Sequence, residues 1–83
     1  MTDISINVRL FGAFRKYGET VTFTMPSGCT VQLVKEKLAE VLSLADVQLI
    51  RDSVLANDNE IIEDSKVLSI DCNLAILPPV CGG

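Results

Sequence analysis

The chain has 83 residues, a formal net charge of −4 and a hydrophobic fraction of 48%. A chain of this length forms one small domain with a marginal core, and its acidic charge argues against nucleic acid or an anionic membrane surface as a partner. No stretch approaches the roughly 20 apolar residues of a membrane span, and the N-terminus lacks the features of a signal peptide, so we expect a cytosolic protein.

The first third of the chain predicts a β-hairpin. Apolar residues alternate with polar ones from Ile4 to Leu10 and again from Thr20 to Met25. This period of two is typical of strands with one buried face. Gly12 and Gly18 bracket the segment between the two strands, which we expect to be a loop. Pro26-Ser27-Gly28 then ends the second strand.

One amphipathic helix is predicted from about Val31 to Ser43. Thr30 precedes it and has a side chain that commonly caps a helix N-terminus. Apolar residues then recur at helical spacing, at Val31, Val34, Leu38, Val41 and Leu42. Charged residues fall mostly on the opposite side of the helix, at Lys35, Glu36, Lys37 and Glu40. We therefore expect these charged side chains to face solvent.

Short apolar runs follow the helix, and we expect them to form short strands. They cover 47–50, 54–56 and 60–62. The last run, 74–77, is apolar at every position, which predicts a central strand covered on both faces. This order of elements predicts an α+β fold in which one main helix packs across a mixed sheet, with the last strand parallel to the first through a right-handed crossover. That is the β-grasp layout of ubiquitin-like domains, and we expect it to occupy residues 1–79.

The residue inventory argues against a catalytic site within the chain itself. Without histidine, no Ser-His or Cys-His pair exists to activate a nucleophile, and the scattered glycines form no phosphate-binding loop. The three cysteines are an odd number without a close pair, which suits a reducing compartment and supplies no zinc site. The carboxylates at 58, 60, 63 and 64 are best interpreted as a solvated rim. We expect no bound metal or cofactor.

The end of the chain carries the most informative motif, Pro78-Pro79-Val80-Cys81-Gly82-Gly83. Two consecutive prolines end a sheet ladder and favour an extended backbone, so residues 80–83 are predicted to form a flexible tail. Four residues span roughly 13 Å, enough to enter a partner's pocket, and side-chain-free Gly82 and Gly83 let a narrow channel close around the chain end. A frayed terminus that merely finishes in glycine is the plain alternative.

The Gly83 carboxylate requires activation before it can react, for example as an acyl-adenylate made by an ATP-dependent partner. Attack by a sulfur donor then leaves a thiocarboxylate. Attack by an amine instead leaves an amide link to another protein. Both outcomes need the same Gly-Gly end.

Two segments together resemble one family. Residues 75–83, Ala-Ile-Leu-Pro-Pro-Val-Cys-Gly-Gly, resemble the apolar strand, Pro-Pro-Val, one variable residue and Gly-Gly of the small subunit of molybdopterin synthase, the MoaD-like sulfur carriers. Residues 10–18 resemble the first hairpin of that family, where an aromatic residue, an Arg and a Gly recur at this spacing. The resemblance covers the whole chain.

The resemblance implies a defined role in molybdenum cofactor biosynthesis. Gly83 is expected to be adenylated by an E1-like adenylyltransferase and sulfurtransferase, which uses ATP, and then converted to a thiocarboxylate. The thiocarboxylate gives its sulfur to cyclic pyranopterin monophosphate. The chain is thus expected to be a sulfur-donating subunit that is not catalytic alone.

The resemblance also implies a large catalytic subunit as partner, in a heterotetramer of two small subunits on a large-subunit dimer. The implied contact residues are Leu77, Pro78, Pro79, Val80 and Cys81. For Leu77, a place in the strand core is at least as good an interpretation. The sequence departs from the family at 70–73, where many relatives carry an Asp-Gly-Asp turn, and at Lys16, where an acidic residue is frequent.

Several alternatives stay open. A ubiquitin-like modifier conjugated through Gly83 uses the same activation, although its tail is typically more basic and polar. A sulfur carrier for another pathway, such as thiamine synthesis or tRNA thiolation, also fits, although thiamine-pathway carriers are usually shorter and lack Pro-Pro. A ferredoxin on the same layout is excluded, because its cluster needs four cysteine ligands.

The cysteines allow two interpretations. Cys81 is either a thiol that exchanges with the reactive end or, more plainly, a variable tail position, since no basic residue lies nearby to activate it. Cys29 and Cys72 are predicted to be small apolar packing residues.

Overall fold

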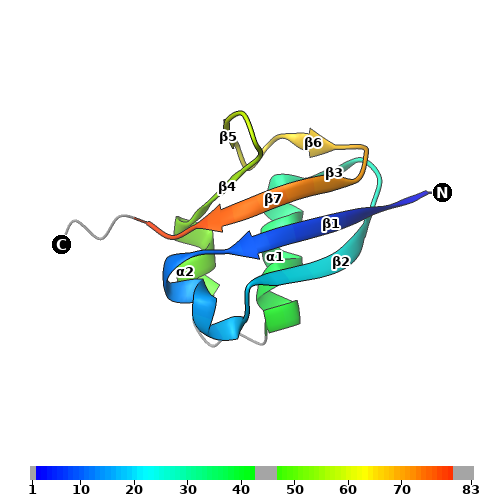
Figure 1. The fold of residues 1–83 in the computed structure, drawn as a ribbon. Coiled ribbons are helices and arrows are strands. Elements are labelled where there is room, and N and C mark those ends of the chain that lie inside the picture. Colours follow the sequence, from blue (N-terminus) through cyan, green and yellow to red (C-terminus); the bar gives the residue numbers. More distant parts are fainter. Residues whose placement is uncertain (1, 43–46, 80–83) are drawn as a thin grey trace.

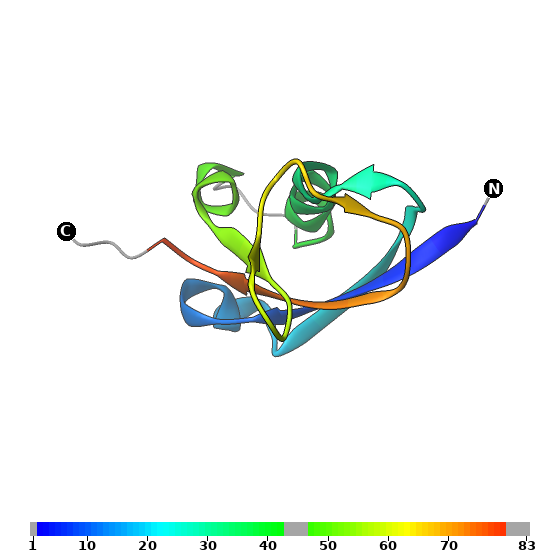
Figure 2. The same cartoon turned by 90° about the horizontal axis from the view of Figure 1, so that it is seen from above.

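The computed structural model describes residues 2–42 and 47–79. Its centre is a five-stranded sheet in the order β2-β1-β7-β4-β5 (Figure 1). These strands are β1 (Asp3–Leu10), β2 (Thr20–Pro26), β4 (Val54–Ala56), β5 (Ile61–Ile62) and β7 (Cys72–Leu77). The helices α1 (Val31–Leu42) and α2 (Val47–Asp52) lie together on one side of this sheet (Figure 2).

The predicted hairpin and the predicted parallel pairing of the last strand are confirmed. β1 pairs antiparallel with β2 from Asp3–Pro26 to Arg9–Thr20, and it pairs in parallel with β7. The period of two is the physical reason for this arrangement, because alternate β1 side chains point at the helices. Those side chains are almost fully buried: Ile4, Ile6, Val8 and Leu10. The fold is therefore the predicted β-grasp.

The expected loop between β1 and β2 is a 3-10 helix, η1 (Gly12–Tyr17). Short-range hydrogen bonds define it, since Phe14 N–H donates to the Phe11 carbonyl at 3.1 Å and Gly18 N–H donates to the Arg15 carbonyl at 3.1 Å. Phe14 is completely buried in the core. Burial of this one aromatic ring gives the segment its fixed conformation.

Helix α1 is confirmed, and its cap lies where the sequence predicts it: Leu33 N–H donates to Thr30 Oγ1 at 3.3 Å. The prediction that the helix charges face solvent is wrong for Lys35, which is only 5% exposed. Lys35 follows Val31 by four positions and precedes Leu38 by three, so it lies on the buried stripe of the helix.

The segment after α1 differs from the prediction. The prediction of a strand at 47–50 is wrong, because these residues belong to helix α2. Ser53 caps the end of this helix: its N–H donates to the Ile50 carbonyl at 3.1 Å, and its Oγ donates to the Leu49 carbonyl at 2.6 Å. A short apolar run fits either a strand or one face of a short helix, so its pattern alone does not decide. Two further strands that the sequence did not signal, β3 (Cys29–Thr30) and β6 (Val67–Leu68), pair with each other.

Strand β7 is central, as predicted, because it lies between β1 and β4. The prediction that both of its faces are covered is wrong. Leu74 and Ile76 are buried under the helices, whereas Ala75 and Leu77 on the other face are half-exposed. The described residues cover the sheet with helices on one face only, and the opposite face is called the outer face below (Figure 2). No helix in the described part of the chain is long and apolar enough to cross a bilayer.

Candidate functional site: the base of the tail

Four of the predicted site residues, Val80, Cys81, Gly82 and Gly83, lie outside the described residues. The structure defines the surface that leads to them. Because β1 and β7 are parallel, both strands end at the same edge of the sheet, so the start of η1 and Pro78-Pro79 lie side by side (Figure 1). We call this place the exit corner, defined by Phe11, Gly12, Leu77, Pro78 and Pro79.

Pro78 and Gly12 are in close contact at the exit corner, although they lie near opposite ends of the sequence. A Cβ atom built on Gly12 would lie 2.6 Å from Pro78 Cγ, well inside van der Waals contact. The backbone of Gly12 has φ +57°, in the left-handed region. Next to it, the Arg9 guanidinium carbon lies 5.5 Å from the centre of the Phe11 ring, within range of a cation–π contact.

On β4, β5 and β7, the outer face beside the exit corner is apolar. The strand register places Ala75 next to Ala56, Ala56 next to Ile61, and Leu77 next to Val54. Ile61 is 60% exposed and Val54 is 38% exposed. We call this the apolar half of the outer face, made of Val54, Ala56, Ile61, Ala75 and Leu77. Together with Pro78 and Pro79, it forms an apolar surface that extends across β7, β4 and β5.

The other end of the outer face is polar. Thr22 Oγ1 donates to Asn7 Oδ1 at 2.8 Å, and Asn7 Nδ2 donates to Asn73 Oδ1 at 3.4 Å. The Ser5 N–H donates to Asp71 Oδ1 at 2.7 Å. We call Ser5, Asn7, Thr22, Thr24 and Asn73 the polar half. The side chains of Asn7, Thr22 and Asn73 bind one another. The turn at 70–73, where the sequence departs from the resembled family, is held by the bond from the Ser5 backbone N–H to Asp71.

The two described cysteines have no features of a reactive thiol. Cys29 is buried in the core, as predicted, and Cys72 is half-buried against it. Burial raises the pKa of both thiols, and for Cys72 the nearby Cys29 and Asp71 raise the pKa further. The Cys72 thiol also donates to the Ile70 carbonyl at 2.9 Å. Both groups therefore stay protonated at neutral pH, the unreactive form.

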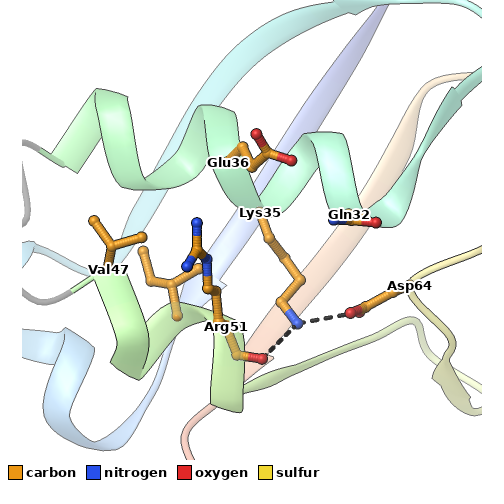
Figure 3. Close-up of a pocket in the computed structure, with 7 residues that line it drawn as sticks. Gln32, Lys35, Glu36, Val47, Arg51 and Asp64 are labelled. Atoms are coloured by element: carbon orange, nitrogen blue, oxygen red, sulfur yellow. Dashed lines mark hydrogen bonds and ion pairs between the residues drawn. The ribbon is translucent and has the colours of Figure 1, made fainter.

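A second candidate site is a cavity of about 280 Å³ between α1 and α2 (Figure 3). Lys35 Nζ lies in its wall and donates to Asp64 Oδ1 and to the Arg51 carbonyl, each at 3.1 Å. Sequence reasoning missed this pair, and Asp64, whose side chain is 56% exposed, is both a solvated rim residue and the ion-pair partner of Lys35. The lining residues are Gln32, Lys35, Glu36, Val47, Ile50, Arg51 and Asp64.

This cavity has the features of a structural contact. The Lys35 charge is balanced by Asp64, and two of the three ammonium donors are already used. Gln32 N–H also donates to the Asp64 carbonyl at 3.0 Å, so the same turn holds the start of α1. Within residues 2–42 and 47–79, no group of three Cys, Asp or Glu side chains lies close enough to hold a metal ion.

The arrangement defines a ubiquitin-like β-grasp domain, and solved structures agree. Crystal structures of SAMP1 and of small archaeal modifier protein 1, both from Haloferax volcanii, match with TM-scores of 0.73 and 0.75. They are 20% and 19% identical in sequence, and the matches cover 95% and 93% of this chain and 99% of each of those chains. A ubiquitin from Caldiarchaeum subterraneum matches with a TM-score of 0.69 at 14% identity, over 99% of this chain and 100% of that one. At these identities the likeness shows the fold alone.

Sequence comparison gives the family. The ThiS family matches residues 8–83, and the chain belongs to this family. The chain is also 34% identical over 85 residues to the molybdopterin synthase sulfur carrier subunit of Arabidopsis thaliana, a match that covers 99% of this chain and 86% of that protein. The resemblance stated from the tail and the first hairpin is thereby confirmed.

Proposed function

We propose that this chain is the sulfur carrier and small subunit of a molybdopterin synthase, with Gly83 as the reacting residue. The observation that carries this proposal is the 34% identity, over nearly the full length, to the Arabidopsis sulfur carrier subunit. The Pro-Pro-Val-Cys-Gly-Gly ending and the apolar surface beside Pro78 support it. The chain is proposed to act in the cytosol, where its three cysteines stay reduced.

The proposed chemistry takes place at the Gly83 carboxyl group. An E1-like partner transfers AMP from ATP to the carboxylate, and pyrophosphate leaves. A sulfur nucleophile then attacks the carbonyl carbon, a C–S bond forms, and AMP leaves with the bonding electrons of the C–O bond. In the synthase, the thiocarboxylate sulfur bonds to a carbon of cyclic pyranopterin monophosphate, and an oxygen substituent leaves that carbon with the bonding electrons of its C–O bond. Water then cleaves the acyl–sulfur bond, which restores the carboxylate and leaves the sulfur on the substrate.

The proposed role of the domain is to deliver the sulfur-bearing chain end to the catalytic subunit, because the chain has no histidine to activate a nucleophile itself. The exit corner and the apolar half together are proposed to bind the large catalytic subunit, with contacts from Leu77, Pro78, Pro79, Val80 and Cys81. Exposed apolar side chains beside the base of the tail support this assignment, since contiguous apolar surface marks protein interfaces. A heterotetramer of two small and two large subunits is the assembly proposed.

Intact-protein mass spectrometry tests the proposal. The chain is incubated with an E1-like activating enzyme, ATP and a sulfur donor, and we expect the mass gain of one oxygen replaced by sulfur. Deletion of Gly82-Gly83 should abolish the gain, whereas Cys81→Ala should be converted at the wild-type rate. No conversion of the wild-type chain, under conditions that convert a known carrier, contradicts the proposal.

A ubiquitin-like modifier is the second candidate, because conjugation through Gly83 needs the same Gly82-Gly83 end. The structural match to small archaeal modifier protein 1, at 19% identity, supports the fold alone. Immunoblotting of cells decides between the two: a ladder of larger bands that disappears in Gly83→Ala supports conjugation. Thiocarboxylate formation without a ladder supports the carrier, and the accepted small-molecule substrate then separates the molybdopterin pathway from other sulfur pathways.

A further inference from the structure

Gly12 is the one described glycine whose missing side chain makes room for another residue. A Cβ atom at this position would lie 2.6 Å from Pro78 Cγ and 3.4 Å from Pro78 Cδ. A proline ring cannot rotate away, because Cδ ties the side chain back to its own backbone nitrogen. Any side chain at position 12 therefore displaces the backbone at Pro78 or at the start of η1.

All three described glycines have a positive φ, but only at Gly12 would a side chain collide with another residue. Gly18 has φ +128° and Gly28 has φ +93°, yet a Cβ atom at either position would meet nothing within 4 Å. Gly12, with φ +57°, is closest to the left-handed region that other residues can enter at moderate cost. Space for the Pro78 ring is thus the stronger demand at Gly12.

The contact is also in the right place to act on the tail. Gly12 begins η1, which is fixed by the buried Phe14, while Pro78 directly follows β7. The ring of Pro78 is therefore held against a rigid part of the domain at the first residue beyond the sheet. From Pro78 to Gly83 the chain can span up to about 17 Å, so a small rotation at its base becomes a large displacement at its end.

We propose that Gly12 is a positioning residue for the tail, and that the Pro78 ring packed against it sets the direction in which the chain leaves β7. The expected effect on sulfur transfer rests on the proposed function. The contact between Gly12 and Pro78 does not, because it is a feature of the folded domain. Gly12 acts through Pro78 and does not touch the reacting carboxyl group in this role.

A double-mutant cycle tests the inference, using Gly12→Ala, Pro78→Ala and the two together. An alanine at 78 keeps only the Cβ atom, which lies 3.9 Å from the built Cβ of residue 12, an ordinary contact. The clash is therefore absent from the double variant. Gly28→Ala is the matched control, because it also places alanine at a positive φ but in open space.

Steady-state sulfur transfer from the thiocarboxylate forms gives the functional readout. With the thiocarboxylate chain as the varied substrate, we expect Gly12→Ala to lower kcat about tenfold and to keep KM within about twofold of the wild-type value. The reason is that the apolar half still binds the partner while the chain end is misdirected. In the Pro78→Ala background the same substitution should change kcat less than about twofold. Gly28→Ala should keep the wild-type kcat. Equal kcat values for Gly12→Ala and wild type overturn the inference, as does an undiminished effect in the Pro78→Ala background.

Solution NMR separates failure of this inference from failure of the proposed function. Wild type and Gly28→Ala should show a nuclear Overhauser effect between Gly12 Hα and Pro78 Hγ, and the residual dipolar couplings of residues 80–83 should change only in Gly12→Ala. If the wild-type chain accepts no sulfur but these couplings change, positioning holds and the proposed function fails. Identical couplings in Gly12→Ala and wild type overturn the positioning role whatever the activity.

Discussion

The two halves of the outer face belong to one sheet and differ in how far their side chains are already engaged. In the polar half, Asn7 accepts from Thr22 and donates to Asn73. In the apolar half, Val54 and Ile61 remain exposed beside the exit corner. Burial of an apolar group by a partner is favourable, whereas burial of a polar group first breaks its existing hydrogen bonds or its contacts with water. The difference supports the proposal that the partner binds next to the tail.

The largest effect should come from the core that both halves share. Phe14→Ala removes a completely buried ring and should lower the free energy of unfolding by about 3–5 kcal/mol. The exposed Thr24→Ala in the polar half should change it by less than about 0.5 kcal/mol. Chemical denaturation of both variants measures the two values. A small loss in Phe14→Ala would show that η1 does not fix the exit corner.

A charge in the apolar half tests the comparison directly. Leu77→Glu should weaken binding to the large subunit about 100-fold, because the interface would bury a carboxylate without a partner. Thr22→Glu is the matched control in the polar half and should weaken binding less than about threefold. Isothermal titration calorimetry gives both affinities, and circular dichroism checks that both variants fold. Equal losses for the two variants would remove the distinction between the halves.

A smaller effect is expected on the helix side of the sheet, at the cavity beside Lys35. Asp64→Ala leaves the Lys35 ammonium with the Arg51 carbonyl alone, and should lower the free energy of unfolding by about 1 kcal/mol, since the Asp64 side chain is 56% exposed and screened. Partner affinity should stay unchanged in the same titration. A loss of affinity larger than the loss of stability would move the interface to the helix side.

The smallest effect concerns Cys72, which precedes Asn73 of the polar half in β7 but packs against the core. Its raised pKa leaves less thiolate at pH 8, so alkylation by iodoacetamide should be a few-fold slower in the folded chain than in the denatured chain. The rate should rise with pH as the thiol ionises. A chain carrying Cys29→Ser and Cys81→Ser isolates the signal. Rapid alkylation at neutral pH would show that packing against the core does not keep the Cys72 thiol protonated.

The sequence was sufficient for the hairpin and the main helix, because their periodic patterns each extend over several residues. It was also sufficient for the central position of the last strand, because the run at 74–77 is apolar at every position. It failed at 47–50, where four residues do not separate a helix from a strand, and at β3 and β6, which have two residues each. It also failed at Lys35, where charge was taken to mean exposure although the spacing from Val31 and Leu38 places it on the buried stripe.

The candidate site also has a part that the sequence predicts and a part that it does not. The tail motif is local in sequence and could be identified there, but the contact between Gly12 and Pro78 depends on the parallel pairing of β1 and β7. The apolar half depends on the register of β4, β5 and β7, which the short strand patterns do not specify. Positions that are close only through the sheet had no signal in the sequence.

The position of β7 between β1 and β4 has a mechanical consequence. A partner that pulls on the chain end would apply tension along the axis of β7, across the hydrogen bonds to β4, which are perpendicular to the strand, and those to β1, which are slanted. These bonds are loaded together in shear, so the strand cannot peel away one bond at a time. We therefore expect the sheet to resist tension on the chain end, and single-molecule pulling from the C-terminus should give a higher rupture force than pulling that peels the edge strand β2 from β1.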